Sequence, residues 1–281
     1  MSKERLQKIL SQAGFGSRRA MEEWIDKGLV RVNGTVAKLG DSAAPFDKIS
    51  LNAKLIRNPL DKNDAIRVLL YHKPIGEICS RSDPAHPQTV FDNIPPIKNG
   101  RWVMVGRLDI NTSGLLIFTN NGELANQLMH PKFGLEREYA ARVRGEVSDQ
   151  IIKNLREGVQ LDDGKAKFQR IEFRGGEGTN SWYHVVLTEG KNREVRRLWE
   201  SQNIEVSRLI RIRYGKLELP RSLSRGQFME LSVKEVDAFV AVYLPSRVIS
   251  VSSSEQVKVS AKPRKQTQRK KGAPRTPKTT G

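Results

Sequence analysis

The sequence predicts an α+β fold with three parts: a small N-terminal unit, a mixed and largely antiparallel sheet domain with helices, and a disordered basic tail. After residue 65, short apolar runs of strand length alternate with isolated helical patterns. Residues 1–60 carry two helical patterns and a hairpin signal of their own. Residues 246–281 have few residues able to build a core. We therefore place the domain limits at 1–60, 65–245 and 246–281.

The N-terminal unit is predicted from local start and stop signals. A first segment with apolar residues at helical spacing ends at Gly14. Ser17 is placed to cap a second helix, which Gly28 ends. Asn33-Gly34 then separates two short strands, which is a strong hairpin signal.

This unit resembles the S4 RNA-binding module in the motif Ser17–Ala20 and in the hairpin sequence Val30–Gly34. The resemblance implies that basic residues on one side of the unit contact RNA phosphates. These residues are Lys3, Arg5, Lys8, Arg18 and Arg19. The alternative is that the charges form only a solvated face.

A polar, proline-containing linker is predicted at 56–64, ahead of the strand-rich domain. Helices are predicted at about 122–130, 148–157 and 191–201, and Ser232 begins a capping box for the last one. Strands are predicted in "AIRVLLYHKP", in the two runs around Asp109, and in "REYAARVRG", "FQRIEF", "SWYHVVLTEG" and "IEVSRLIRIRY". Gly175-Gly176 lies between "FQRIEF" and "SWYHVVLTEG".

The run Gly106-Arg107-Leu108-Asp109 is the most informative feature of this domain. It follows an apolar run at 102–105 and precedes turn formers and a second apolar run at 115–118. Asp109 is thus expected where the chain leaves one buried strand and turns toward another. A partly desolvated carboxylate on a rigid frame suits a nucleophile or a general base. The alternative is an ordinary turn aspartate that bonds to backbone amides.

This motif and its successors resemble the ribosomal RNA pseudouridine synthases. The matching segments are "GRLD" with its Thr-Ser-Gly, "LEREYAARVRG", "GVQLDDG", "GGEG", "LTEGKNREVRRLWE" and "VSRLIRIRYGKLELP". They cover the chain from Ala65 to about Phe239 in the family's order. The resemblance implies isomerisation of a uridine of 23S rRNA near the peptidyl-transferase region, in free rRNA or in a large-subunit assembly precursor.

Such a reaction needs a carboxylate, a pocket for an extruded base and a proton acceptor for C5. By the resemblance, Asp109 attacks the nucleoside covalently, at C1′ or C6, and Tyr139 stacks on the flipped uracil. An ionised Asp109 needs a neighbouring cation, and the resemblance to the family's third motif implies that Arg196, six positions after Gly190, is the bidentate partner that ionises and orients it. Leu209 resembles the apolar residue that closes the pocket, although strand cores also contain leucine. The predicted substrate-binding residues are Leu209, Arg107, Lys191, Arg193 and Arg197, together with Lys3, Arg5, Arg18 and Arg19 in the N-terminal unit.

Lys73-Pro74 of "YHKPIG" matches the family's first motif and is expected to support the site from below. No redox or group-carrying cofactor is expected, because the rearrangement gains and loses no atoms. The four histidines and Cys79 lack the spacing of a zinc site, and Asp109–Asn120 departs from a calcium loop at its twelfth position. Gly158–Lys165 resembles a P-loop only loosely, and no G-x-G-x-x-G run is present.

Charge agrees with a nucleic-acid partner. The formal net charge is +18 and the isoelectric point about 10.1. The tail holds ten Lys/Arg against one Glu, which gives +9. An acidic membrane surface or simple solubility could also account for the charge.

The single cysteine fits a reducing compartment, and no signal peptide or membrane span is evident. We expect a cytoplasmic monomer without membrane contact. Two other functions fit part of the sequence: a non-catalytic RNA-binding or ribosome-assembly factor, and a DNA-binding protein. The former would not need Asp109, Tyr139 and Arg196, and the latter lacks a recognition helix.

Overall fold

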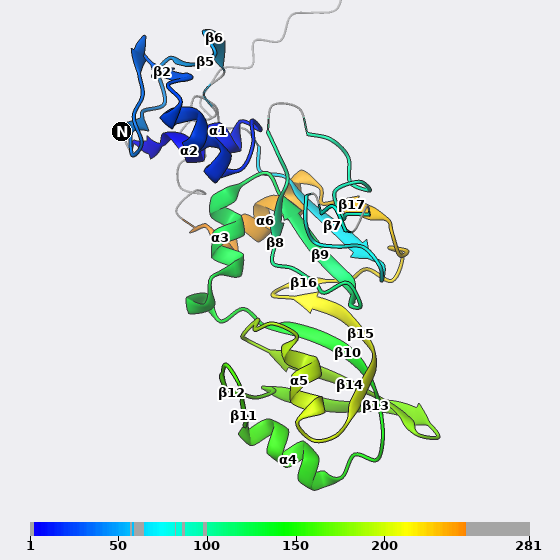
Figure 1. The fold of residues 1–281 in the computed structure, drawn as a ribbon. Helices are drawn as coiled ribbons and strands as arrows, with labels where there is room; N and C mark the ends of the chain where they lie inside the picture. The colour runs from blue at the N-terminus through cyan, green and yellow to red at the C-terminus, as the bar shows by residue number, and fades with distance from the viewer. Residues whose placement is uncertain are drawn as a thin grey trace, which may run out of the picture.

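The computed structural model describes residues 3–56, 58, 65–81, 83–85, 88–97 and 100–245. Figure 1 shows a small N-terminal module (dark blue) beside one end of a long, twisted sheet. Most of the predicted linker and the whole predicted tail, 246–281, lie outside the described residues. The domain limits therefore stay predictions.

The N-terminal module packs two helices against small sheets, as the local signals predicted. Ser17 Oγ accepts the N–H of Ala20 and caps α2. Asn33 and Gly34 both adopt positive φ, and this tight turn joins β2 to β3. The module's four-stranded sheet has the order β3-β2-β5-β6, and β1 pairs with β4. Its elements are β1 Glu4–Arg5, α1 Leu6–Gln12, α2 Arg18–Asp26, β2 Val30–Val32, β3 Thr35–Val36, β4 Ser42–Ala43, β5 Ile49–Leu51 and β6 Lys54–Ile56.

The main sheet follows the order β13-β14-β10-β15-β9-β7-β17, with β16 paired to β15 and β8 paired to β9. Its pairings are antiparallel except for β9 with β15, which are parallel. This confirms a mixed, largely antiparallel sheet. The strands are β7 Val68–Lys73, β8 Val103–Val105, β9 Ser113–Thr119, β10 Arg137–Arg144, β13 Arg170–Glu177, β14 Asn180–Leu187, β15 Glu205–Tyr214, β16 Leu217–Glu218 and β17 Phe228–Glu230.

The parallel pair divides the sheet into two halves with separate cores. In one half, α4 and α5 cover β10, β13, β14 and β15. In the other, α3 and α6 pack on β7, β8 and β9 (Figure 1), and a further apolar cluster covers the opposite face of β7 and β9. The remaining elements are α3 Gly122–Met129, the 3-10 helix η2 Pro131–Phe133, α4 Asp149–Glu157, β11 Val159–Leu161, β12 Gly164–Ala166, α5 Glu194–Glu200 and α6 Val233–Tyr243.

Two predicted elements differ from those observed. The helix expected at 191–201 begins only at Glu194, because Arg193 adopts a left-handed φ of 48°. β13 does not stop before Gly175-Gly176 but continues through both glycines with a bulge after Phe173. In contrast, Ser232 and Glu235 form the predicted capping box.

Candidate active site

Asp109 lies on the loop that joins β8 to β9, as the sequence predicts. β8 ends at Val105, Gly106 turns the chain with a φ of 71°, and β9 begins at Ser113. The loop is held by backbone hydrogen bonds from Thr112 N to Asp109 O (3.0 Å) and from Gly76 N to Ile110 O (2.9 Å). The half-buried Asp109 side chain lines a cavity of about 720 Å³, a volume typical of small-ligand sites.

Lys73 supports this loop from below. The residue is fully buried, and its ammonium donates to the carbonyl oxygens of Pro74 (2.9 Å), Asp109 (3.2 Å), Ile110 (3.4 Å) and Thr112 (3.0 Å). Burial lowers the pKa of Lys73, although the nearby Cys79, Glu77 and Asp109 oppose that shift. The predicted supporting role of the Lys-Pro motif is confirmed by these contacts.

Gly114 lets β9 and β15 approach each other closely enough to pair. It has a φ of 111°, and a Cβ added there would lie 2.3 Å from Arg211 O. The parallel register places Arg211 opposite Gly114 and Ile210 opposite Ser113. Ser113 and Gly114, which directly follow the Asp109 loop, thus join the loop to β15.

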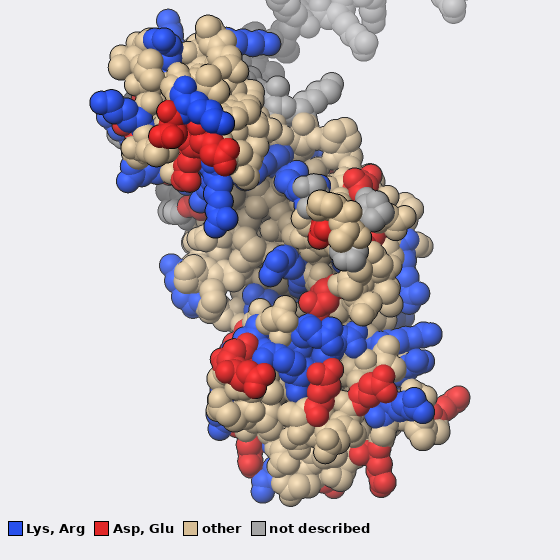
Figure 2. All heavy atoms as spheres, in the orientation of Figure 1, with Lys and Arg blue, Asp and Glu red and all other residues tan. Residues whose placement is uncertain are grey.

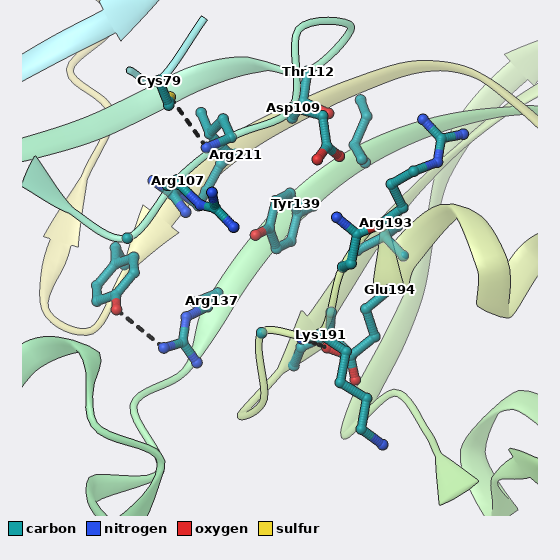
Figure 3. Close-up of a pocket in the computed structure, with 18 of the residues that line it drawn as sticks. Cys79, Arg107, Asp109, Thr112, Arg137, Tyr139, Lys191, Arg193, Glu194 and Arg211 are labelled. Carbon is teal, nitrogen blue, oxygen red and sulfur yellow. Dashed lines mark hydrogen bonds between the residues drawn. The ribbon is translucent and has the colours of Figure 1, made fainter. Parts of the chain in front are cut away.

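Tyr139 and Leu209 come from β10 and β15 and line the same cavity as Asp109. Tyr139 is half-buried and pairs in register with Arg211, whereas the buried Leu209 pairs with Ala141. Figure 3 shows the Asp109 carboxylate and the Tyr139 ring directed into one common space. The structure therefore brings together the predicted carboxylate, aromatic and apolar groups.

The predicted ion pair between Arg196 and Asp109 is not formed. The buried Arg196 guanidinium donates instead to Val206 O (2.6 Å) and to Asn111 O (2.9 Å). The physical reason is that Arg196 meets the loop backbone two residues beyond Asp109. Burial is the main cause that lowers the pKa of Arg196, and the charge of Arg193 lowers it further. The negative charge of Asp109 raises the same pKa. Arg196 thus contacts the Asp109 loop without binding its carboxylate.

The predicted substrate-binding cations fall into two groups. Arg107, Lys191 and Arg193 line the cavity, but Lys191 bonds to Lys165 O (2.8 Å) and its ammonium lies far from Asp109 (Figure 3). Arg197 does not line it and forms a bidentate pair with Asp163 (2.9 and 2.7 Å). Lys3, Arg5, Arg18 and Arg19 belong to the N-terminal module and are not among the lining residues.

Arg211 and Arg137 line the cavity but were not predicted. Arg211 is only 2 % exposed, donates Nε to Leu115 O (2.8 Å), and has a buried Nη2 without a hydrogen-bond partner. Arg137 is held by Thr188 O and Glu189 O (both 2.9 Å) and by the Tyr214 hydroxyl (3.0 Å; Figure 3). A signal for Arg211 existed, because alternate strand residues share a face and Arg211 stands two residues after Leu209.

The cavity thus combines an available carboxylate, an aromatic wall and fixed guanidinium groups. Lys and Arg side chains gather in and around the hollow in the middle of the face in Figure 2.

Burial raises the pKa of the Cys79 thiol, whose Sγ accepts the N–H of Leu108 (3.3 Å). Among the described residues, no group of three or more His, Cys, Asp or Glu could hold a metal ion. None of the helices that the structure describes is long and apolar enough to span a membrane.

Comparisons with known proteins agree with this geometry. The family model described as "RNA pseudouridylate synthase" matches residues 67–201, and the "S4 domain" model matches residues 4–49. The chain is 55% identical over 233 residues to "Ribosomal large subunit pseudouridine synthase B" of Yersinia pestis, covering 82% of this chain and 73% of the relative.

The protein of the same name from Escherichia coli (strain K12) is 53% identical over 236 residues, covering 83% of this chain and 81% of the relative. A solved structure, "Crystal structure of pseudouridylate synthase", aligns with a TM-score of 0.57 and 23% identity. It covers 83% of this chain and 98% of that one, and shows that the fold is shared.

Proposed function

The chain belongs to the RNA pseudouridylate synthase family, and on this premise we propose that it converts a uridine of large-subunit ribosomal RNA into pseudouridine, with Asp109 as the nucleophile. The observation that carries this proposal is the state of Asp109. Its carboxylate lines the cavity beside Tyr139, on a loop fixed by Lys73. Among the described residues, no basic side chain forms an ion pair with this carboxylate within 4.0 Å.

The reaction breaks the bond from N1 to C1′, rotates the uracil and forms a bond from C5 to C1′. The proton that leaves C5 is balanced by the one that N1 gains, so no atom enters or leaves. A covalent bond from the Asp109 carboxylate to the nucleoside, at C1′ or C6, divides this rearrangement into easier steps. The base must leave its stack to reach Asp109, and the cavity supplies the space for a flipped nucleotide.

The neighbouring side chains suit the remaining tasks. The Tyr139 ring can stack on the flipped uracil, and its hydroxyl can receive the C5 proton. Leu209 offers an apolar surface for the base on the adjacent strand. Arg107 and Arg193 at the cavity wall suit phosphate contact. Arg196 acts as a positioning residue, because it holds the carbonyl of Asn111 within the Asp109 loop.

The names of the relatives support large-subunit rRNA as the substrate. A uridine of 23S rRNA near the peptidyl-transferase region, in free rRNA or in an assembling particle, is the finer proposal. We also propose a monomer that works in the cytoplasm, where rRNA is made and where the single Cys79 stays reduced.

Release of tritium from 5-labelled uridine in a large-subunit rRNA transcript tests this function. We expect Asp109→Asn to abolish release while RNA affinity stays close to that of the wild type, because the amide keeps the shape but is not a nucleophile. Asp162→Asn is the matched control, since Asp162 is exposed on the turn between β11 and β12. Wild-type turnover by Asp109→Asn would refute the assignment. Carbodiimide mapping of rRNA from cells without this protein would identify the uridine.

A further inference from the structure

Three arginines meet where the N-terminal module contacts the sheet domain. Arg101 Nη1 donates to Gly16 O (2.8 Å), in the turn that joins α1 to α2. Gly14, in the same turn, lies so close to Gly100 that an added Cβ would be 2.9 Å from Gly100 O. Arg18 is the first residue of α2 and follows Gly16 by two positions. The Arg101 guanidinium thus lies beside the start of α2.

Arg81 brings a third guanidinium to this junction. It donates to the carbonyl of Trp102, the residue after Arg101, and it lies 4.2 Å from the centre of the Phe91 ring. Burial, and next the charges of Arg81 and Arg18, lower the pKa of Arg101. Burial also lowers the pKa of Arg81. We call Arg18, Arg81 and Arg101 the junction arginines.

In the part of the chain that the structure describes, no carboxylate compensates the junction arginines. Among the described residues, no ion pair within 4.0 Å joins any of them to an acidic side chain. The Nε of Arg101 is buried without a hydrogen-bond partner. Elsewhere, Arg67 pairs with Glu230 and Arg197 with Asp163. Because clustered cations repel one another and a buried donor without a partner is costly, an anion from outside the chain suits this junction.

The junction also lies close along the chain to residues that line the active-site cavity. Arg81 directly follows Cys79 and Ser80, which both line the cavity with Asp109. Arg18 lies at the N-terminus of α2, where the helix dipole favours a negative group. Figure 2 shows basic side chains in the hollow between the N-terminal module and the rest of the molecule. The junction therefore adjoins two residues of the cavity wall along the chain.

We propose that the junction arginines bind one backbone phosphate of the RNA strand that carries the target uridine. This site rests on the proposed function for the identity of its ligand. It is shared between the two parts of the protein: Arg18 comes from the N-terminal module, and Arg81 and Arg101 come from the sheet domain. RNA bound there fixes the module against the cavity and sets the distance between its own contacts and the flipped nucleotide.

Salt-dependent binding of the full chain to a fluorescein-labelled large-subunit rRNA transcript tests the site. The variants are Arg18→Gln, Arg81→Gln and Arg101→Gln. The matched control is Arg144→Gln, an exposed arginine at the end of β10, in the half of the sheet away from the module (Figure 1). Loss of one phosphate contact should flatten the slope of log K against log salt by about 0.7–0.9 and weaken binding roughly ten-fold at low salt.

Because the phosphate is shared, Arg18→Gln combined with Arg81→Gln should lose the same single contact as either variant alone. A double variant that loses twice the slope would overturn the shared site, and so would single variants that bind like Arg144→Gln. Thermal unfolding without RNA provides a second measurement. Arg18→Gln should unfold at the wild-type temperature or above it, because one repulsive charge is removed; a lower temperature would indicate a structural role and overturn the proposal.

Failure of this site and failure of the proposed function are distinguishable. The control Arg144→Gln should keep the wild-type turnover at saturating RNA, since Arg144 neither belongs to the junction arginines nor lines the cavity. A wild-type protein that shows the predicted slopes but releases no tritium would refute pseudouridine formation and leave the junction site standing.

Discussion

Replacing Lys73 with Met should both destabilise the protein and displace the Asp109 loop. Met keeps most of the aliphatic stem but removes the ammonium that donates to four carbonyl oxygens. Asp109 O and Ile110 O retain backbone donors, Thr112 N and Gly76 N. The main loss therefore concerns the carbonyls of Pro74 and Thr112.

Hydrogen bonds that involve a charged group contribute about 1.5–3 kcal/mol each. Two of them give an expected loss of about 3–6 kcal/mol in the free energy of unfolding, a large part of the total stability of a typical domain. Because the ammonium also holds the loop carbonyls of Asp109, Ile110 and Thr112, we expect slower chemistry in the protein that remains folded.

Urea unfolding and single-turnover tritium release at saturating RNA measure the two effects separately. Lys153→Met is the control, because Lys153 is exposed on α4 and its pairing with Glu157 is long, at 3.9 Å. An unfolding midpoint for Lys73→Met equal to that of the control would refute the energetic argument. Normal single-turnover chemistry in a destabilised Lys73→Met protein would show that the ammonium does not position Asp109.

Two further predictions follow from other contacts. Gly114→Ala should cost about 2–6 kcal/mol, from left-handed backbone strain and from the clash of its Cβ with the Arg211 backbone; wild-type stability in urea would contradict the parallel pairing of β9 with β15. The hydrogen bonds from Arg67 lower the pKa of Glu230 below its ordinary value of 4.5. The resulting stabilisation is complete above pH 4.5 and is lost as the pH falls through the folded-state pKa, so Glu230→Gln should flatten the acid limb of the stability curve by at most about 1 kcal/mol. Unfolding temperatures between pH 3 and 7 check this, and an unchanged acid limb would contradict it.

Elements with local signals were predictable from the sequence. Ser17, Asn33-Gly34 and Ser232 each determine backbone geometry within a few residues, and the structure confirms the helices and the hairpin they predict. Asp109 was predictable for a similar reason, because its loop is bounded by two apolar runs. The family motifs, rather than any local pattern, identified Tyr139.

Contacts across the sheet were not predictable in this way. Nothing in the apolar pattern indicates that β9 and β15 run parallel. Arg211 was missed for another reason: its spacing of two residues from Leu209, which indicates a shared face of the strand, was not used. The predicted ion pair of Arg196 with the Asp109 carboxylate is not formed, because the motif identifies the residue but not which atoms of the loop it contacts. The guanidinium donates to backbone carbonyls instead. The late start of α5 depends on the unusual φ of Arg193, for which arginine carries no propensity signal.

The parallel pair of β9 and β15 has a consequence for how such an enzyme can change over evolutionary time. Asp109, the proposed nucleophile, comes from one half of the sheet and the aromatic wall from the other, and each half has its own core. Each core can therefore accumulate substitutions independently of the other while the protein keeps its activity. Substitutions in either half must preserve the short pairing of Gly114 with Arg211, because it joins the Asp109 loop to the half of the sheet that carries Tyr139.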